Sequence, residues 1–253
     1  MIHRIPLEGF ATNTVTSPRE EVSKPSAATP ATPPLVEGQH LDQPTFHARY
    51  EAMPPGFRAE LIGGVVSFPG RVGYEHGESS ACLGCWLAYF QEFTRGVDVL
   101  SHVTVILDGR NEPQPDMTLR ILPECGGRTR DEDGYVVGVP EMVAEVSKSS
   151  RFIDLGPKLA EYERAGVLEY LVRAFDPDEV LWHVLQEGRL AAVPPDEDGL
   201  YHSRVFPGLW LDPQALLALD TRRLREVIDL GAKSPEHAAF VAKLASAREK
   251  PAG

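Results

Sequence analysis

The stretch Pro140-Glu-Met-Val-Ala-Glu145-Val-Ser147 contains a short apolar run that is typical of a central, fully buried strand. Alternating or apolar runs on either side of it predict further strands, and two longer segments predict helices. The expected strands span residues 97–107, 115–121, 167–172, 180–185 and 190–193, and the expected helices span 74–94 and 153–165. This order predicts an α/β fold in which one mixed central β-sheet is flanked by helices.

The two ends of the chain differ in composition from the part between them. Residues 1–42 are rich in Pro, Thr, Ser and Ala, and such a segment buries too little apolar surface to offset the entropy of ordering it. We therefore expect a disordered arm over 1–42, a globular domain over 43–231 and a C-terminal helix over 232–253. Ser234-Pro-Glu236 has the cap, proline and acid of a helix start.

Composition limits the classes of protein to which the chain can belong. The 253 residues are 42% hydrophobic, which suffices for a core, and they contain no apolar run long enough to cross a membrane. Three cysteines argue against a disulfide framework and favour a cytoplasmic protein. The net charge of −12 counts against tight, non-specific binding of nucleic acid, but it does not exclude a local basic groove.

Several familiar site patterns are weak or missing. Cys82 and Cys85 lie inside an expected helix without a second pair, so a zinc site has little support. The sequence has no Walker loop, no Gly-x-Ser-x-Gly and no His-x-x-x-His pair. His76, at the start of a long helix, could face a cleft or only the core.

Two carboxylates form the best chemical candidate. Pro115-Asp116 starts one expected strand, and Glu145 ends another about thirty residues later. Mg²⁺ prefers oxygen ligands, takes one or two carboxylates and keeps water for the rest. Such an ion can lower the pKa of water and neutralise charge on a phosphodiester. By itself the pair is weak evidence, because an acid at a strand end is usually a solvated or capping group.

Four segments, in order, resemble the Uma-type family of putative restriction endonucleases, a branch of the PD-(D/E)XK superfamily. The resemblance covers residues 44 to about 220. It rests on an early hairpin, a Pro-Asp strand, a Pro-x-x-x-x-Glu-Val-x-Ser strand and a helix followed by a strand. These are Ala59 to Gly64, Gln114 to Asp116, Pro140 to Ser147 and Asp154 to Tyr170. It implies a restriction-endonuclease-like fold, an endonuclease that cuts DNA with Mg²⁺ or Mn²⁺, and a homodimer.

The chain departs from the superfamily pattern at the catalytic lysine. That lysine stands two residues after the glutamate, on the same face of the strand, but here the position is Ser147. Lys148 is one residue further and should point the other way. The resemblance suggests that Lys158, from the following helix, replaces the missing lysine. The alternative is that Lys158 forms only a surface ion pair with Asp154, four residues before it.

The resemblance also marks Glu60, in the hairpin, as a further carboxylate near the metal. Asp116, Glu145 and Lys158 are thus the expected catalytic residues, with Asp116 and Glu145 as metal ligands, and Glu60, Lys148 and Asp154 as additional candidates. Two other interpretations stay open. The chain could be a nuclease fold that has lost catalysis and serves as a binding or scaffold module, or a structural α/β domain whose contacts run through the arm.

Overall fold

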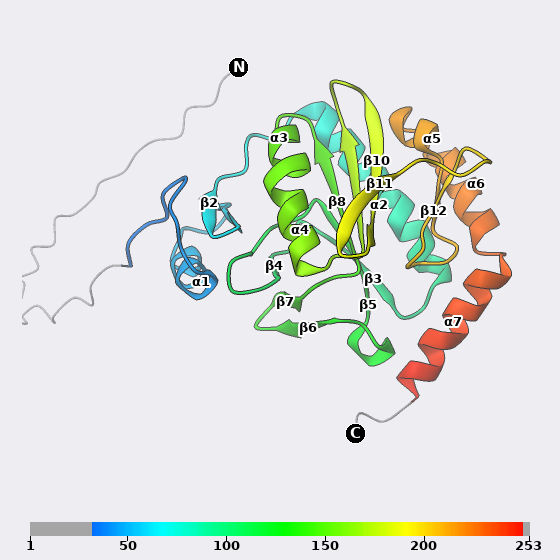
Figure 1. The fold of residues 1–253 in the computed structure, drawn as a ribbon, viewed down its shortest axis with the longest axis horizontal. Helices are drawn as coiled ribbons and strands as arrows, with labels where there is room; N and C mark the ends of the chain where they lie inside the picture. The colour runs from blue at the N-terminus through cyan, green and yellow to red at the C-terminus, as the bar shows by residue number, and fades with distance from the viewer. Residues whose placement is uncertain (1–31, 250–253) are drawn as a thin grey trace, which may run out of the picture. The chain divides into compact units, whose positions relative to one another are not determined.

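A six-stranded mixed sheet forms the centre of the computed structural model, which describes residues 32–249 (Figure 1). Its strand order is β11-β10-β9-β8-β5-β3, and only β8 and β9 run parallel to each other. The strands are β3 (Val97–Ser101), β5 (Met117–Ile121), β8 (Met142–Ser147), β9 (Glu169–Ala174), β10 (Glu179–Gln186) and β11 (Arg189–Val193). The expected mixed central sheet flanked by helices is confirmed.

Helices cover both faces of the sheet. In Figure 1, α2 (Tyr74–Phe93) lies with the C-terminal helices on one side, and α4 (Leu159–Ala165) lies on the other. The C-terminal helices are α5 (Pro213–Leu217), α6 (Thr221–Gly231) and α7 (Pro235–Arg248). Because side chains alternate along β8, Met142, Ala144 and Val146 enter the core under α2, while Val143 and Glu145 face α4.

A tight hairpin next to the sheet carries Glu60. Strands β1 (Glu60–Ile62) and β2 (Val65–Ser67) are joined by Gly63 and Gly64, which both have positive φ angles, as a two-residue turn of this kind requires. A Cβ atom at Gly64 would lie 3.2 Å from the Leu41 carbonyl oxygen. The hairpin packs on α1 (Gln43–Glu51) and bridges to Glu112 just before β5, so Glu60 is directed at the sheet.

The helix that follows β8 changes its geometry at a proline. A short helix, α3 (Arg151–Ile153), passes into a π-helical turn, η2 (Asp154–Lys158), and then into α4. Pro157 has no N–H to donate to the Ile153 carbonyl, so a regular α-helical bond is not available there. In this wider turn, both Asp154 and Lys158 are buried.

Three expectations about the elements need correction. Residues 97–107 do not form one strand, because the chain leaves β3 at His102, and β4 (Val105–Ile106) pairs with β7 in another sheet. Residues 123–134, for which the sequence predicts a loop between the strands, hold a short helix, η1 (Pro123–Cys125), and the strand β6 (Thr129–Glu132), which pairs with β7 (Tyr135–Gly138) across an Asp133-Gly134 turn. Helix α6 was not expected. A last short pair is β12 (Tyr201–His202) with β13 (Trp210–Leu211).

Residues 32–42, which composition assigns to the arm, instead contact the hairpin. Leu35 is buried against it, the Gly38 and Leu41 N–H groups donate to the Val66 and Gly64 carbonyls, and Asp42 caps α1. An extended segment can add to a folded unit through backbone bonds that its composition does not reveal. The rest of the expected arm, residues 1–31, lies outside the described residues, as do residues 250–253.

Within residues 32–249, no helix has the length and apolar character needed to cross a bilayer.

A chain that starts at residue 43 should be less stable than one that starts at residue 32. It loses the burial of Leu35, worth about 1.5–3 kcal/mol, and the Asp42 cap, worth about 1 kcal/mol. For a domain of this size, we expect the melting temperature to fall by roughly 5–10 °C. Calorimetry of the two truncated chains measures the difference, and equal melting temperatures would contradict the packing described for 32–42.

Glu169, at the start of β9, is a buried carboxylate that holds the segment after β12. It accepts hydrogen bonds from the Ser203 hydroxyl at 2.6 Å and the Arg204 N–H at 2.7 Å. Burial raises the pKa of Glu169 from its ordinary 4.5 to about 7, although these hydrogen bonds favour the charged form. The folded protein therefore holds this proton more tightly than the unfolded chain does.

This shift makes stability depend on pH. The contribution of Glu169 to the free energy of unfolding is fully present below pH 4.5. It is lost as the pH rises through 7, because the folded state must then release a proton that it binds more tightly than the unfolded chain does. The loss is on the order of 3 kcal/mol. Glu169→Gln removes this titration, so its free energy of unfolding relative to wild type should rise between pH 4.5 and 8. Urea unfolding of both proteins at several pH values tests this, and a constant difference would contradict it.

Candidate active site

Asp116 and Glu145 meet where β5 and β8 lie side by side. The Asp116 N–H lies 3.3 Å from Oε2 of Glu145, and Oδ2 of Asp116 accepts a hydrogen bond from the Val146 N–H at 2.8 Å. Both side chains are buried. Met117 of β5 pairs with Ala144 of β8 in an antiparallel register. Asp116, just before Met117, therefore lies opposite Glu145, just after Ala144. The two carboxylates predicted as metal ligands therefore share one site.

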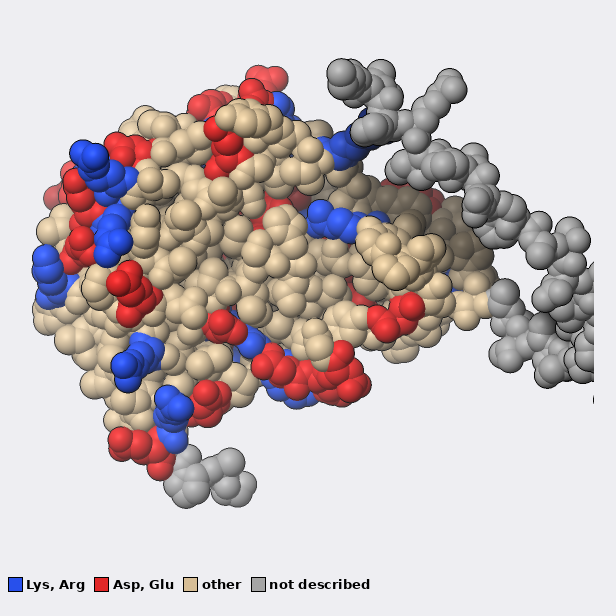
Figure 2. Space-filling model, turned by 180° about the vertical axis from the view of Figure 1, so that it is seen from behind, with Lys and Arg blue, Asp and Glu red and all other residues tan. Residues whose placement is uncertain are grey.

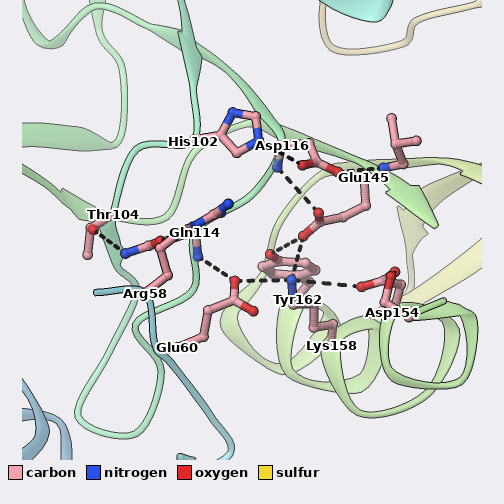
Figure 3. A network of polar contacts seen from close by, with 12 residues as sticks. Arg58, Glu60, His102, Thr104, Gln114, Asp116, Glu145, Asp154, Lys158 and Tyr162 are labelled. Carbon is pink, nitrogen blue, oxygen red and sulfur yellow. Dashed lines mark hydrogen bonds and ion pairs between the residues drawn. The ribbon is translucent and has the colours of Figure 1, made fainter. Parts of the chain in front are cut away.

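Lys158 reaches the same site from the helix that follows β8. Its Nζ atom lies 2.9 Å from Oε1 of Glu145, 3.1 Å from Oε1 of Glu60 and 3.8 Å from Oδ1 of Asp154 (Figure 3). The lysine side chain is only 7% exposed. The alternative, in which Lys158 forms only a surface ion pair with Asp154, does not fit, because the contact with Asp154 is the longest of the three.

Glu60 and Tyr162 complete the surroundings of the lysine. Oε1 of Glu60 also accepts a hydrogen bond from the Gln114 N–H at 2.6 Å, which ties the hairpin to the segment before β5. The Tyr162 hydroxyl, one helical turn beyond Lys158, donates to Oε1 of Glu145 at 3.2 Å. The hairpin, the two neighbouring strands and the helix thus each bring a polar side chain to the surroundings of Lys158 (Figure 3).

Two histidines bracket Asp116. Nε2 of His76 lies 3.2 Å from its Oδ2, and Nε2 of His102 lies 3.1 Å from its Oδ1. His76 comes from the first turn of α2, where the sequence left its direction open. No sequence pattern pointed to His102. It sits just after β3 with φ of 52°, a left-handed conformation that is rare for a residue with a side chain, and Ser101 holds its Nδ1.

The pKa values of these two carboxyl groups are shifted in opposite directions. Burial by itself would raise the pKa of Asp116, but the hydrogen bonds from His102, His76 and Val146 outweigh it and hold that pKa far below its ordinary value. Burial raises the pKa of Glu145 well above normal. Lys158 opposes this shift, whereas the charges of Asp116, Asp154 and Glu60 add to it. Asp116 is therefore ionised without added cations, whereas burial opposes the charge on Glu145.

Lys158 keeps its charge despite its burial. Desolvation would lower the pKa of the ammonium, but the facing carboxylates of Glu145, Glu60 and Asp154 raise it well above its ordinary value. Lys158 contacts three buried carboxyl groups, and Asp116 is a fourth at the same site. The acidic side chains of the site therefore outnumber its lysine, and their oxygens are the ligand type that a hard divalent cation takes.

A pocket of about 110 Å³ opens onto these groups. Its floor includes Glu60, Asp116, Glu145, Asp154 and Lys158, and its walls come from the segment after β2 and the segment after β8. Substrate can therefore approach the carboxylates from solvent on this side.

Other candidates lie elsewhere. Lys148 is half exposed, pairs with Glu75 and does not line the pocket. Arg173 is buried against Phe175 and pairs with Asp178 at 2.5 Å, so it is not placed for a substrate phosphate. The three cysteines are free, and Cys82 and Cys125 are buried.

The donor set fits a hard divalent cation. Among residues 32–249, no three His, Cys, Asp or Glu side chains are already grouped as a closed metal cage. Mg²⁺ does not require one, since it usually takes one or two carboxylates and completes its octahedron with water and substrate oxygens. Asp116 and Glu145 would hold it.

Comparisons with known proteins identify the family and the fold. A family described as "Putative restriction endonuclease" matches residues 44–214. A solved structure of a putative nuclease from Anabaena variabilis superposes with a TM-score of 0.51 at 13% identity, over 72% of this chain and 97% of that one. At this identity the match shows a shared fold. No curated protein matches the sequence.

The family match spans more than half of the chain, in the region that holds the sheet, the hairpin and all the site residues. The chain therefore belongs to the Uma-type family of putative restriction endonucleases.

Proposed function

We propose that the protein is a metal-dependent endonuclease that hydrolyses phosphodiester bonds of DNA, with Mg²⁺ as its cofactor and Mn²⁺ as a substitute. Family membership and the fold both support a nuclease. The single observation that carries the finer proposal is the cluster at the pocket floor. There, Asp116 and Glu145 share one site, and the buried ammonium of Lys158 lies 2.9 Å from Glu145.

Each residue has a distinct task in this proposal. Asp116 and Glu145 hold the cation, which when bound would neutralise phosphodiester charge and activate water. Lys158 takes the place of the lysine that Ser147 cannot supply, and its charge is available to phosphoryl oxygens in the transition state. Glu60 and Asp154 hold the ammonium, and Lys148 has no role at the pocket floor. His76 and His102 orient the Asp116 carboxylate through its two oxygens.

The protein's partners follow from the same proposal. DNA is a transient substrate, and a homodimer would let two sites cut two strands, as the two-fold symmetry of most oligomers allows. Three free cysteines suit the cytoplasm that composition suggests.

Removing either metal-binding carboxylate should abolish both cation binding and cleavage. Asp116→Asn and Glu145→Gln keep the size of the side chain but remove a negative oxygen ligand. Because such an ion contributes several kcal/mol to stabilising transition-state charge, cleavage should fall by at least about a hundredfold. Calorimetric titration with Mg²⁺ and Mn²⁺, together with a plasmid nicking assay, measures both effects.

Glu169→Gln is the matched control, since it also neutralises a buried glutamate but outside the pocket. It should bind the metal and cut like wild type. If wild-type protein binds Mg²⁺ or Mn²⁺ yet cuts no nucleic acid, the protein is a lapsed nuclease that serves as a binding module. If the wild-type protein binds neither ion, the proposed metal site is wrong.

Replacing Lys158 should have two separable effects. Lys158→Met leaves Glu145, Glu60 and Asp154 without their buried cation, which should cost up to about 3–5 kcal/mol of stability without metal. Mg²⁺ should recover part of this loss by supplying positive charge. Cleavage should not recover, because the ion cannot provide the ammonium. Thermal unfolding with and without Mg²⁺, and the nicking assay, measure the two effects.

Lys148→Met decides between the two candidate lysines. If that variant loses cleavage while Lys158→Met cuts at the wild-type rate, Lys148 is the catalytic lysine and the assignment above is wrong.

A further inference from the structure

The mouth of the pocket exposes apolar side chains that the chemistry at its floor does not use. Four of the seven exposed large hydrophobic residues within 32–249 belong to the two segments that form the pocket walls. They are Val72, Tyr74, Phe152 and Ile153, and we call them the mouth residues. The rings of Phe152 and Tyr74 are 85% and 79% exposed. Exposed aromatic groups concentrated around one opening indicate a contact surface.

The two wall segments lie close together. A Cβ atom at Gly70 would lie 3.8 Å from Oγ of Ser149, and the ion pair of Lys148 with Glu75 links the start of α2 to the segment after β8. Val72 and Ile153 both line the pocket, Tyr74 follows Val72 by two residues, and Phe152 immediately precedes Ile153.

Two arginines on the pocket walls are available to an anion. Arg58 and Arg71 line the pocket, and neither forms an ion pair with a carboxylate among the described residues. Arg58 makes only a long contact, 3.4 Å, with the Gln114 side-chain oxygen. A guanidinium group suits a phosphate because it offers several donors in one plane. The pocket therefore has an acidic floor for a cation and arginines for phosphate, and the segments that line it carry exposed aromatic residues.

The net charge and the face shown in Figure 2 do not favour binding of a duplex through its phosphate backbone. The net charge is −12, and Figure 2 shows Lys and Arg scattered among Asp and Glu on the face it displays. Binding that depends on many phosphates needs a continuous basic surface. Here the affinity for nucleic acid must come from a few phosphate contacts and from stacking.

We propose that the mouth residues stack on unpaired nucleobases, so that the substrate is a single-stranded or locally unpaired nucleic acid. The proposal rests on the proposed nuclease function and specifies its substrate. A base can lie on the ring of Phe152 or Tyr74 only if its face is free, whereas a base inside a duplex is covered by its neighbours on both faces. Arg58 and Arg71 would then contact the phosphates on either side of that base.

The test compares binding of a labelled single strand with binding of the duplex of the same sequence. Fluorescence anisotropy with the full chain in Ca²⁺, an oxygen-binding cation, should show tighter binding of the single strand. Phe152→Ala and Tyr74→Ala should each weaken single-strand binding by about 5- to 100-fold, the range expected for one lost base–aromatic contact. Phe152→Trp should restore it. With two arginines in contact, the logarithm of affinity should fall with the logarithm of salt concentration at a slope of about −1.4.

Phe93→Ala is the matched control, because Phe93 is another partly exposed aromatic residue of α2 but lies at its far end, outside the pocket. It should bind like wild type. Equal or tighter binding of the duplex, or unchanged single-strand binding by both alanine variants, would overturn the proposal. So would a dimer, seen by sedimentation, that Phe152→Ala dissociates without changing single-strand affinity. Loss of cleavage with intact, ring-dependent binding would instead count against the nuclease function alone.

Discussion

The buried ammonium of Lys158 is the group on which the rest of the site depends. It faces Glu145, Glu60 and Asp154, which come from the central sheet, from the hairpin and from its own helix. A carboxylate withdrawn from water without a partner is costly, and these three have one shared partner. The same contacts keep the lysine charged. Asp116, at the same site, is held instead by His76, His102 and the Val146 N–H.

Backbone geometry fixes this arrangement from three directions. The turn at Gly63-Gly64 folds the hairpin so that Glu60 reaches the Gln114 N–H and the lysine. The missing N–H of Pro157 accompanies a π-helical turn in which Asp154 and Lys158 are both buried. Pairing of β5 with β8 puts Asp116 beside Glu145. Each of these features is local, but the site exists only where the three meet. A π-helical turn at this position is in keeping with the frequent occurrence of such turns at functional sites in other proteins.

The differences between expectation and structure have identifiable physical causes. Strand β6 is polar, and β7 has only four residues, so neither shows an extended apolar pattern, although Asp133-Gly134 is a hairpin signal that could have revealed them. Helix α6 also has a sequence signal that could have revealed it. Its buried residues have helical spacing, at Leu224, Val227, Ile228 and Gly231, and Asp220 is its cap. Residues 32–42 pack through Leu35 and backbone bonds, which composition does not report. His102 has no sequence signature, because its position depends on where β3 ends.

The sequence by itself determined the six strands of the central sheet in their chain order, and it predicted Asp116 and Glu145 as the paired acids, because these follow from local apolar patterns and from family motifs. It also named Lys158 as the substitute for the lysine missing at position 147. Only the tertiary structure decided that Lys158 lies closer to Glu145 and Glu60 than to Asp154, and that two histidines hold Asp116. It also decided that Tyr74 and Phe152 are exposed. Those facts depend on distances between residues far apart in the chain, which packing fixes and local pattern does not encode.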